Sequence, residues 1–387
     1  MKCNFLPYFT ALSLLFMPGY SFGTNAKSIE FYQGPEISSD AWGQRMRANG
    51  DNLKQHKVRQ MFLVHGTFVG DDPSGLINFL GSVDPHHKLP ILPGIIQGLK
   101  QGQKKLTDII ARDGGNYTNE YAQKLCSTLG NDICDVKDNF DWGSGDYHFA
   151  RLDGALKLAQ RIAEKITEKQ ISNDDRVLLL GHSHAGQVFA LLTTLLEDGE
   201  KGKQIKKAII KSNKVPEDRK KRFQGDLDII KGVFLDFVTF GTPVRYQWGR
   251  NDKWRLLPVI NHRANSTLLG IPAVKDGDYV QQWGVEGTDL PSDTLADNKL
   301  LDSILDDGLN PGALIGNLNE KGRRQPKYWD GSPVHENVLV DYHDNYQGPL
   351  PIPLPTYSIG KVFGHGVYTT NKAMLFNTGL IIKRFYP

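Results

Sequence analysis

Residues 177–192 read VLLLGHSHAGQVFALL and place a single serine, Ser183, between two apolar runs. Gly181 precedes this serine by two positions, and Ala185 and Gly186 follow it closely. A strand that turns sharply into a helix needs small residues on both sides of the turn, because the two elements almost touch there. Such a turn holds its central side chain clear of the backbone. The pattern therefore predicts a serine nucleophile at the carboxyl end of a buried strand.

The rest of the chain alternates between strand-like and helix-like stretches. Strand patterns cover 58–64, 136–142, 176–181, 233–240, 279–285 and 338–342, and helical spacing covers 147–166, 185–196 and 371–385. This alternation predicts the α/β class, with a mainly parallel sheet and helices on both faces. Side chains at the carboxyl ends of parallel strands meet at one edge of the sheet. His65, Ser183, Gly241 and Asp289 each follow a predicted strand, so we expect them to gather there.

Three stretches of the chain resemble the lipase-like branch of the α/β-hydrolase superfamily: LVHGTF (63–68), LLGHSHAG (179–186) and FVTFGTPV (237–244). The family pattern around the nucleophile is Gly-x-Ser-x-Gly, and here Ala185 stands in place of the second glycine. The resemblance implies an α/β-hydrolase fold in one catalytic domain, residues 24–387. Lid or cap insertions are expected near 71–135, 199–231 and 290–335.

The resemblance also implies an oxyanion hole, which is a pair of backbone N–H groups aimed at the charge that develops on the substrate. In this family the donors are the residue after His-Gly and the residue after the nucleophile. Carried over, these are Thr67 and His184. His65 is then expected to brace the loop rather than to act as a base.

A serine hydroxyl becomes a good nucleophile only when a histidine takes its proton. In the resembled family the chain order is serine, acid, histidine, and the histidine lies between the last strand and the last helix. His365, in FGHGVYTT (363–370), has a glycine on each side and precedes the helical stretch 371–385. We predict His365 as the base, with His343 as the alternative and His335 as a third possibility.

The acid in this family follows the strand after 233–240. Asp289 lies in WGVEGTDLPSD (283–293), directly after the strand-like stretch 279–285. We predict that Asp289 orients His365, with Asp293 and Glu286 as competitors. Asp289 could instead cap a helix that starts near Ser292, because aspartate is a common helix N-cap.

The first 23 residues have the layout of a secretory signal peptide, with a basic start, an apolar run at 5–17 and a breaker after it. This predicts an exported protein, periplasmic or secreted. Cys126 and Cys134 lie eight positions apart in CSTLGNDIC (126–134), and in an exported chain such a pair is expected to form a disulfide.

The formal net charge of the chain is +3, which is too small to indicate a nucleic-acid partner, and no nucleic-acid-binding motif is present. The sequence predicts no cofactor and no metal site. Residues 200–222 carry ten lysines and arginines. That segment is expected to be a solvated surface or to contact anionic lipid headgroups at a membrane surface.

Together these features predict a hydrolase that cleaves carboxylic esters of fatty acids, a lipase, phospholipase or lysophospholipase, whose substrate is a lipid or ester. Two other classes remain open. An acyltransferase would use the same three residues with an alcohol in place of water, and a catalytically silent binding protein would use only the scaffold.

Overall fold

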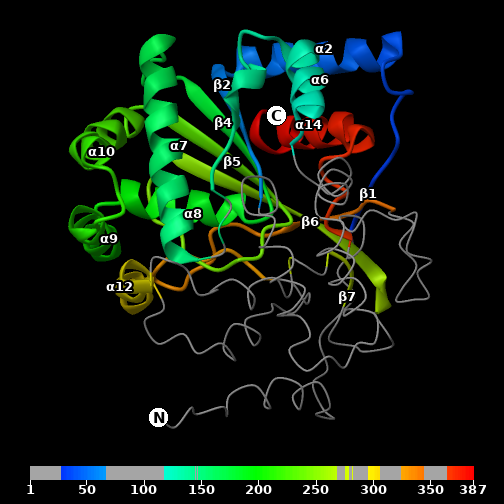
Figure 1. The fold of residues 1–387 in the computed structure, drawn as a ribbon. Coiled ribbons are helices and arrows are strands. Elements are labelled where there is room, and N and C mark those ends of the chain that lie inside the picture. The colour runs from blue at the N-terminus through cyan, green and yellow to red at the C-terminus, as the bar shows by residue number, and fades with distance from the viewer. Residues whose placement is uncertain are drawn as a thin grey trace, which may run out of the picture.

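The structure is a computed structural model, and it describes residues 28–66, 117–143, 145, 147–267, 275–278, 281, 295–305, 324–343 and 364–387 (Figure 1). Its strands are β1 (Ile29–Glu30), β2 (Val58–Val64), β3 (Asn139–Phe140), β4 (Arg176–His182), β5 (Phe234–Phe240), β6 (Trp254–Thr267), β7 (Lys275–Gly277) and β8 (Val338–Asp341). Its helices are α2 (Asp40–Gln55), α6 (Asn119–Leu129), η1 (Val136–Asp138), α7 (His148–Glu168), α8 (Ala185–Leu196), α9 (Glu200–Lys211), α10 (Glu217–Ile230), α12 (Leu295–Leu305) and α14 (Asn371–Phe385).

Seven strands form a parallel sheet in the order β1-β8-β6-β5-β4-β2-β3, and β7 pairs with β6 in the antiparallel direction. The chain runs from β2 outward to β3 and then returns past β2 to β4. The strand order therefore reverses between β2 and β4. In α/β proteins, ligands bind in the crevice at the carboxyl ends of the strands where this reversal occurs. β2 ends at Val64 and β4 ends at His182, directly before Ser183.

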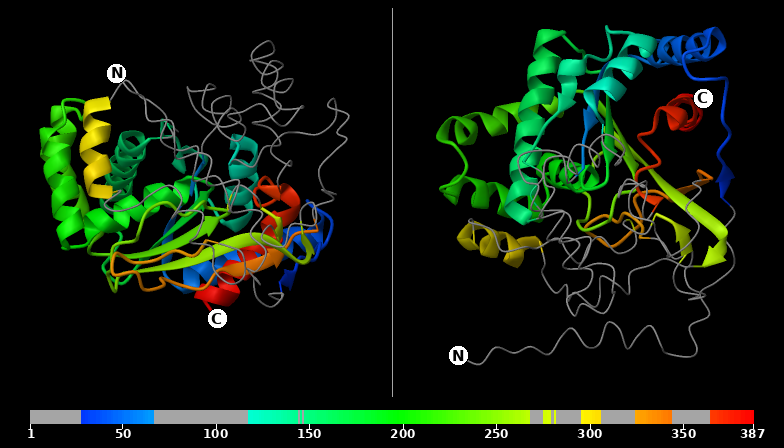
Figure 2. Two further views of the ribbon diagram at one scale, coloured as in Figure 1. Left: turned by 90° about the horizontal axis from the view of Figure 1, so that it is seen from below. Right: turned by 45° about the vertical axis from the view of Figure 1, so that its right-hand side comes forward.

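Each face of the sheet is covered by helices, as Figures 1 and 2 show. Alternate residues of the central strands point to opposite faces. Phe62 and Leu179 pack with α7, α8, α9 and α10, and Met61 and Leu178 pack with α2, α6 and α14. Strands buried on both faces read as nearly continuous apolar runs, which is why 177–180 is VLLL. The predicted α/β class and parallel sheet are confirmed.

Among the elements that were not predicted from the sequence, two have clear physical reasons. β6 holds Pro258 in a central strand, opposite Thr239 of β5, and proline normally argues against such a position. The 16-residue helix α2 lies in a polar stretch of the sequence, and only a few of its own residues are buried. Of the predicted strand 279–285, the structure describes Gln281, whose backbone N–H donates to the side chain of Asp278 and not to another strand.

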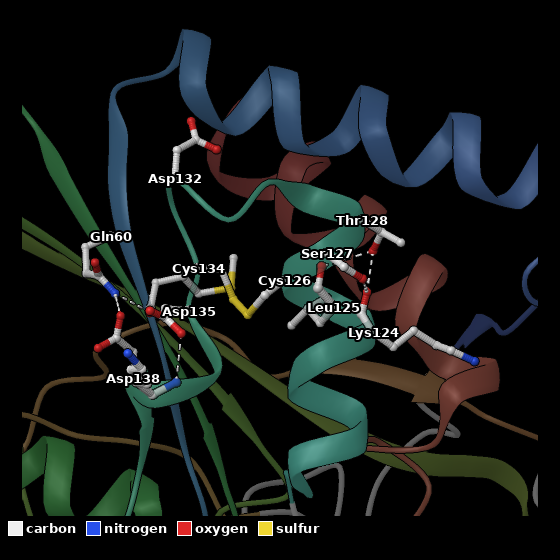
Figure 3. Close-up of a disulfide and its surroundings, with 12 residues drawn as sticks. Gln60, Lys124, Leu125, Cys126, Ser127, Thr128, Asp132, Cys134, Asp135 and Asp138 are labelled. Atoms are coloured by element: carbon white, nitrogen blue, oxygen red, sulfur yellow. Dashed lines mark hydrogen bonds between the residues drawn. A yellow bond between two sulfur atoms is a disulfide. The ribbon is translucent and has the colours of Figure 1, made fainter.

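The predicted disulfide is confirmed: Cys126 of α6 is bonded to Cys134 (Figure 3). Both cysteines are buried, and the bond ties α6 to the segment that precedes η1. That segment contacts β2, because the backbone N–H of Met61 donates to the carbonyl of Ile133 at 2.7 Å. The amide nitrogen of Gln60 likewise donates to Asp138 of η1 at 2.8 Å. The disulfide therefore links α6 to the strand that leads into His65.

We expect the double variant Cys126→Ala/Cys134→Ala to lose about 2.5 kcal/mol of unfolding free energy, because the loop that the bond closes is short and its closure entropy is modest. Denaturant unfolding, followed by circular dichroism, measures this loss. Ser127→Ala in the same helix is the control and should change stability by less than about 0.5 kcal/mol, since Ser127 is exposed. A double variant as stable as the wild type would contradict the expectation.

Residues 1–27 lie outside the described residues, so the signal peptide remains a prediction. Within the described part of the chain, no helix combines the length and the apolar character that crossing a membrane requires.

Candidate active site

Ser183 occupies a strained turn between β4 and α8. Its φ of 55° lies in the left-handed region, which is unusual for a residue other than glycine. The backbone N–H of Ser183 donates to the carbonyl of Phe240 at the end of β5, at 2.9 Å. Its carbonyl accepts from the hydroxyl of Thr242 at 2.7 Å. The turn is thus held from the neighbouring strand, and it has the strand–turn–helix layout that the sequence predicts.

The residues around Ser183 must be small, because neighbouring side chains lie very close to their backbone. A Cβ on Gly181 would come within 2.5 Å of the Phe189 ring and 3.1 Å of the Cβ of Ala185. A Cβ on Gly186 would collide with the side chain of Thr242. Residue 185 keeps a methyl group because glycine faces it across the turn at position 181. This packing explains how the turn accommodates alanine in place of the second glycine of the pattern.

The loop after β2 lies against the serine. A Cβ on Gly66 would be 2.5 Å from the Cβ of Ser183 and 3.3 Å from its Oγ. The ring of His65 donates from Nδ1 to the carbonyl of Gly66 at 2.7 Å, and the indole N–H of Trp142 donates to the carbonyl of His65 at 2.9 Å. These contacts make His65 a brace of the loop. Thr67, the predicted oxyanion donor, lies outside the described residues.

The second predicted oxyanion donor, His184, is buried at the N-cap position of α8. The amino end of a helix carries partial positive charge and favours anions beside it. His184 therefore lies at the amino end of α8, directly after Ser183, and its role as an oxyanion donor stays a prediction.

His365 lies against His182, the residue directly before Ser183. The Nε2–H of His182 donates to the carbonyl of His365 at 3.0 Å, and the two ring centroids are 4.6 Å apart. Burial and the nearby His365 lower the pKa of His182 well below its usual value, so this ring stays neutral. The Nε2 of His365 is itself buried and has no hydrogen-bond partner among the described residues. That nitrogen remains able to accept a proton.

The other ring nitrogen of His365 contacts a buried carboxylate. Nδ1 lies 2.9 Å and 3.0 Å from the two carboxylate oxygens of Asp278, a fully buried residue that follows β7. A buried carboxylate must be stabilised by donors. Its donors besides His365 include the hydroxyl of Tyr368 at 2.6 Å and the backbone N–H of Gln281 at 2.9 Å. Asp278 thus fixes which nitrogen of His365 carries the proton.

The sequence analysis assigned the acid to Asp289, which lies outside the described residues together with Glu286 and Asp293. The contact of Nδ1 with both oxygens of Asp278 makes Asp278 the candidate acid. Sequence reasoning did not consider Asp278, because β6 was not recognised and a partner for the histidine was sought in a later strand-like stretch. The available signal was an aspartate at a glycine turn in KDGD (275–278).

The alternative bases lie elsewhere. The Nε2 of His343 is 2.6 Å from the carboxylate of Glu30 in the edge strand β1, and the side chain of His343 is 55% exposed. β8, which ends just before His343, is three strands away from β4. His335 is exposed and bonds the carbonyl of Glu336. In the described part of the chain, neither ring contacts Ser183 or Asp278.

One group of possible metal ligands is present among the described residues. Single ligand atoms of Glu30, Asp341 and His343 lie within 4.8 Å of one another. The group is at the edge of the sheet, and Arg263 approaches the same carboxylate of Asp341 at 3.8 Å. It adds nothing to the site around Ser183.

The fold and this geometry define an α/β protein in which a buried His365–Asp278 pair lies against His182, the residue directly before Ser183. Comparison of the chain with family models, with curated proteins and with solved structures found no match in any of the three.

Proposed function

We propose that the chain is a serine hydrolase of the α/β-hydrolase type that cleaves carboxylic esters of fatty acids, with Ser183, His365 and Asp278 as its catalytic residues. The observation that carries this proposal is the presence of two features together at the carboxyl ends of the central strands. Ser183 stands on a left-handed turn, and His365 contacts the residue before it, His182. The Nδ1 of His365 is held by a buried carboxylate, while its Nε2 has no partner among the described residues.

In the proposed acylation, the Oγ of Ser183 attacks the ester carbonyl carbon while the Nε2 of His365 takes the hydroxyl proton. Asp278 stabilises the imidazolium that forms. The tetrahedral intermediate collapses as the C–O bond to the alcohol breaks, and His365 returns its proton to the leaving oxygen. Water then attacks the acyl-serine and gives a proton to His365, and as the acyl C–O bond to Oγ breaks, His365 passes that proton to Oγ and the free acid is released.

The neutral state of His182 suits this sequence. A second positive charge 4.6 Å from the ring of His365 would oppose formation of the imidazolium. Because burial keeps His182 uncharged, its ring can hold the loop of His365 through a hydrogen bond without that electrostatic cost.

The fatty-acid part of the proposal rests on the three lipase-like stretches of the sequence, and the proposed export rests on the signal-like start. The disulfide supports export, because such bonds persist mainly in oxidising compartments. The proposed lipid-contacting surface of α9 has fewer exposed apolar residues than its sequence suggests. On α9, Ile205 and Ile209 are buried in the core, which leaves Ile210, 60% exposed, beside the lysines.

A fluorophosphonate probe tests the proposal, because it labels a serine only when an adjacent base activates the hydroxyl. We expect labelling of the wild type and of Ser212→Ala, and none of Ser183→Ala. Ser212 is a matched control, since it is a buried serine whose hydroxyl accepts from the N–H of Lys214. Hydrolysis of p-nitrophenyl butyrate should follow the same pattern.

A wild type that resists the probe would refute the hydrolase proposal and favour the silent binding protein. Labelling that survives in Ser183→Ala would show that another residue is the nucleophile. Product analysis with an added alcohol separates the hydrolase, which releases the free acid, from an acyltransferase, which forms a new ester.

A further inference from the structure

Behind the carboxylate of Asp278 lies a buried tyrosine that the proposed mechanism does not use. Tyr368 is 1% exposed and follows His365 by three residues. Its hydroxyl lies 2.6 Å from the Oδ2 of Asp278, the same oxygen that is 2.9 Å from the Nδ1 of His365. The phenol and the imidazole therefore share one carboxylate oxygen.

Asn261 of β6 fixes this arrangement from the sheet. Its backbone N–H donates to the hydroxyl oxygen of Tyr368 at 2.7 Å, and its carbonyl accepts from the backbone N–H of Asp278 at 2.9 Å. Its side-chain amide donates to the carbonyl of Gly364, directly before His365, at 2.9 Å. One residue of a central strand thus holds the loops of Asp278 and His365 as well as the tyrosine.

The direction of the tyrosine hydrogen bond follows from its partners. Because the N–H of Asn261 donates to the phenol oxygen, the phenol proton is left for the carboxylate, which can only accept. Burial and the charge of Asp278 raise the pKa of Tyr368 well above its usual value. The phenol therefore remains a donor throughout the pH range in which a histidine titrates.

We propose that Tyr368 is a positioning residue, whose hydroxyl locks the carboxylate of Asp278 against His365 and takes up part of its negative charge. This inference rests on the proposed function. A hydrogen bond to a charged group is stronger than one between neutral groups, and the donors to one carboxylate compete for the same charge. Removing the phenol proton donor should leave more of that charge for the imidazolium of His365, and it should allow the carboxylate to rotate.

Among the described residues, the titratable groups that contact His365 are Asp278 after β7, His182 at the end of β4 and Tyr368 on the loop of His365 itself. His184 and His65 also lower the pKa of His182. His182 is neutral, so Asp278 is the main charge that His365 senses. A change at Tyr368 therefore reaches His365 through Asp278.

The test compares Tyr368→Phe with Tyr342→Phe. Tyr342 is also buried, its ring lies 5.3 Å from that of Tyr368, and its hydroxyl bonds the uncharged side chain of Asn377 at 2.7 Å. Tyr368→Phe loses the hydrogen bonds to Asp278 and from Asn261, Tyr342→Phe loses the bond to Asn377, and only Tyr368→Phe removes a donor to Asp278. On p-nitrophenyl butyrate, Tyr368→Phe should lower kcat about tenfold and move the acidic limb of kcat/KM to higher pH by about half to one unit.

Tyr342→Phe should leave the pH profile unchanged. An unchanged limb in Tyr368→Phe, or an equal shift in Tyr342→Phe, overturns the inference, because a merely structural tyrosine would lower stability without moving the limb.

A second readout separates this inference from the proposed function. The ring of His365 is titrated by NMR in Ser183→Ala and in Ser183→Ala/Tyr368→Phe, with the signal assigned by its loss in His365→Ala. A higher pKa of His365 in the double variant supports the inference even if the wild type cleaves no ester. Equal titration curves overturn it even if the wild type is an active hydrolase.

Discussion

Asp278→Asn should lower kcat on a short-chain ester by about 10⁴-fold, with little change in KM, as removal of the triad carboxylate does in serine proteases. An asparagine side chain fills the same space but no longer supplies the charge that stabilises the imidazolium. It can also donate from its amide to Nδ1, which would move the ring proton to Nε2 and block that nitrogen as a base. Steady-state kinetics on p-nitrophenyl butyrate measure the effect.

The matched variant Asp289→Asn replaces the acid that the sequence analysis favoured. Its kcat should stay within about twofold of the wild type, because Nδ1 of His365 is already bonded to Asp278. A large loss in Asp289→Asn, or an Asp278→Asn variant that keeps more than a tenth of wild-type kcat, would show that the acid has been assigned to the wrong residue.

His365→Ala should reduce kcat by about 10⁴- to 10⁶-fold and slow fluorophosphonate labelling to a comparable extent, since Ser183 then has no base. The loss should not arise from unfolding. The carbonyl that accepts from His182 belongs to the backbone of residue 365 and is retained in the variant. Circular dichroism and the unfolding midpoint check that the fold is preserved.

His343→Ala is the control for this variant. His343 lies at the sheet edge against Glu30, so its removal should leave kcat unchanged. If His343→Ala were the inactive variant and His365→Ala the active one, the base would be the alternative that the sequence left open.

The turn at Ser183 could be predicted from the sequence because local contacts determine it. The positions that must hold small residues are 181, 185 and 186, all within three positions of the serine. The sequence shows a glycine or an alanine at each of them. The α/β class was predictable for a similar reason, since strands buried on both faces must be apolar throughout.

Asp278 could not be found in that way. Its place depends on the pairing of β6 with β7, and β6 contains a proline and an asparagine in the middle of the sheet. Asn261 weakens the strand pattern, yet its hydrogen bonds to Gly364, Asp278 and Tyr368 are what assemble the site. The polar residue that obscured the strand is thus part of the support for the candidate acid.

Helix α2 shows a different difficulty. Trp42, Met46, Gly50 and Leu53 form its buried side, and a glycine among so few contacts hides the helical spacing. That glycine is required because any Cβ at position 50 would collide with the backbone of Leu129 in α6. The contact between α2 and α6, which are distant in the chain, requires glycine at position 50. The sequence around that position therefore could not explain this residue.

The hydrogen bonds that attach the candidate site to β5 and β6 affect how activity would be lost on heating or in denaturant. Ser183 is tethered to the last residue of β5, and the loops of Asp278 and His365 are both tethered to one residue of β6. Central strands are the segments that open last in native-state fluctuations. Heat or denaturant should therefore not erode the catalytic geometry gradually, because the three groups disperse only when the sheet itself melts.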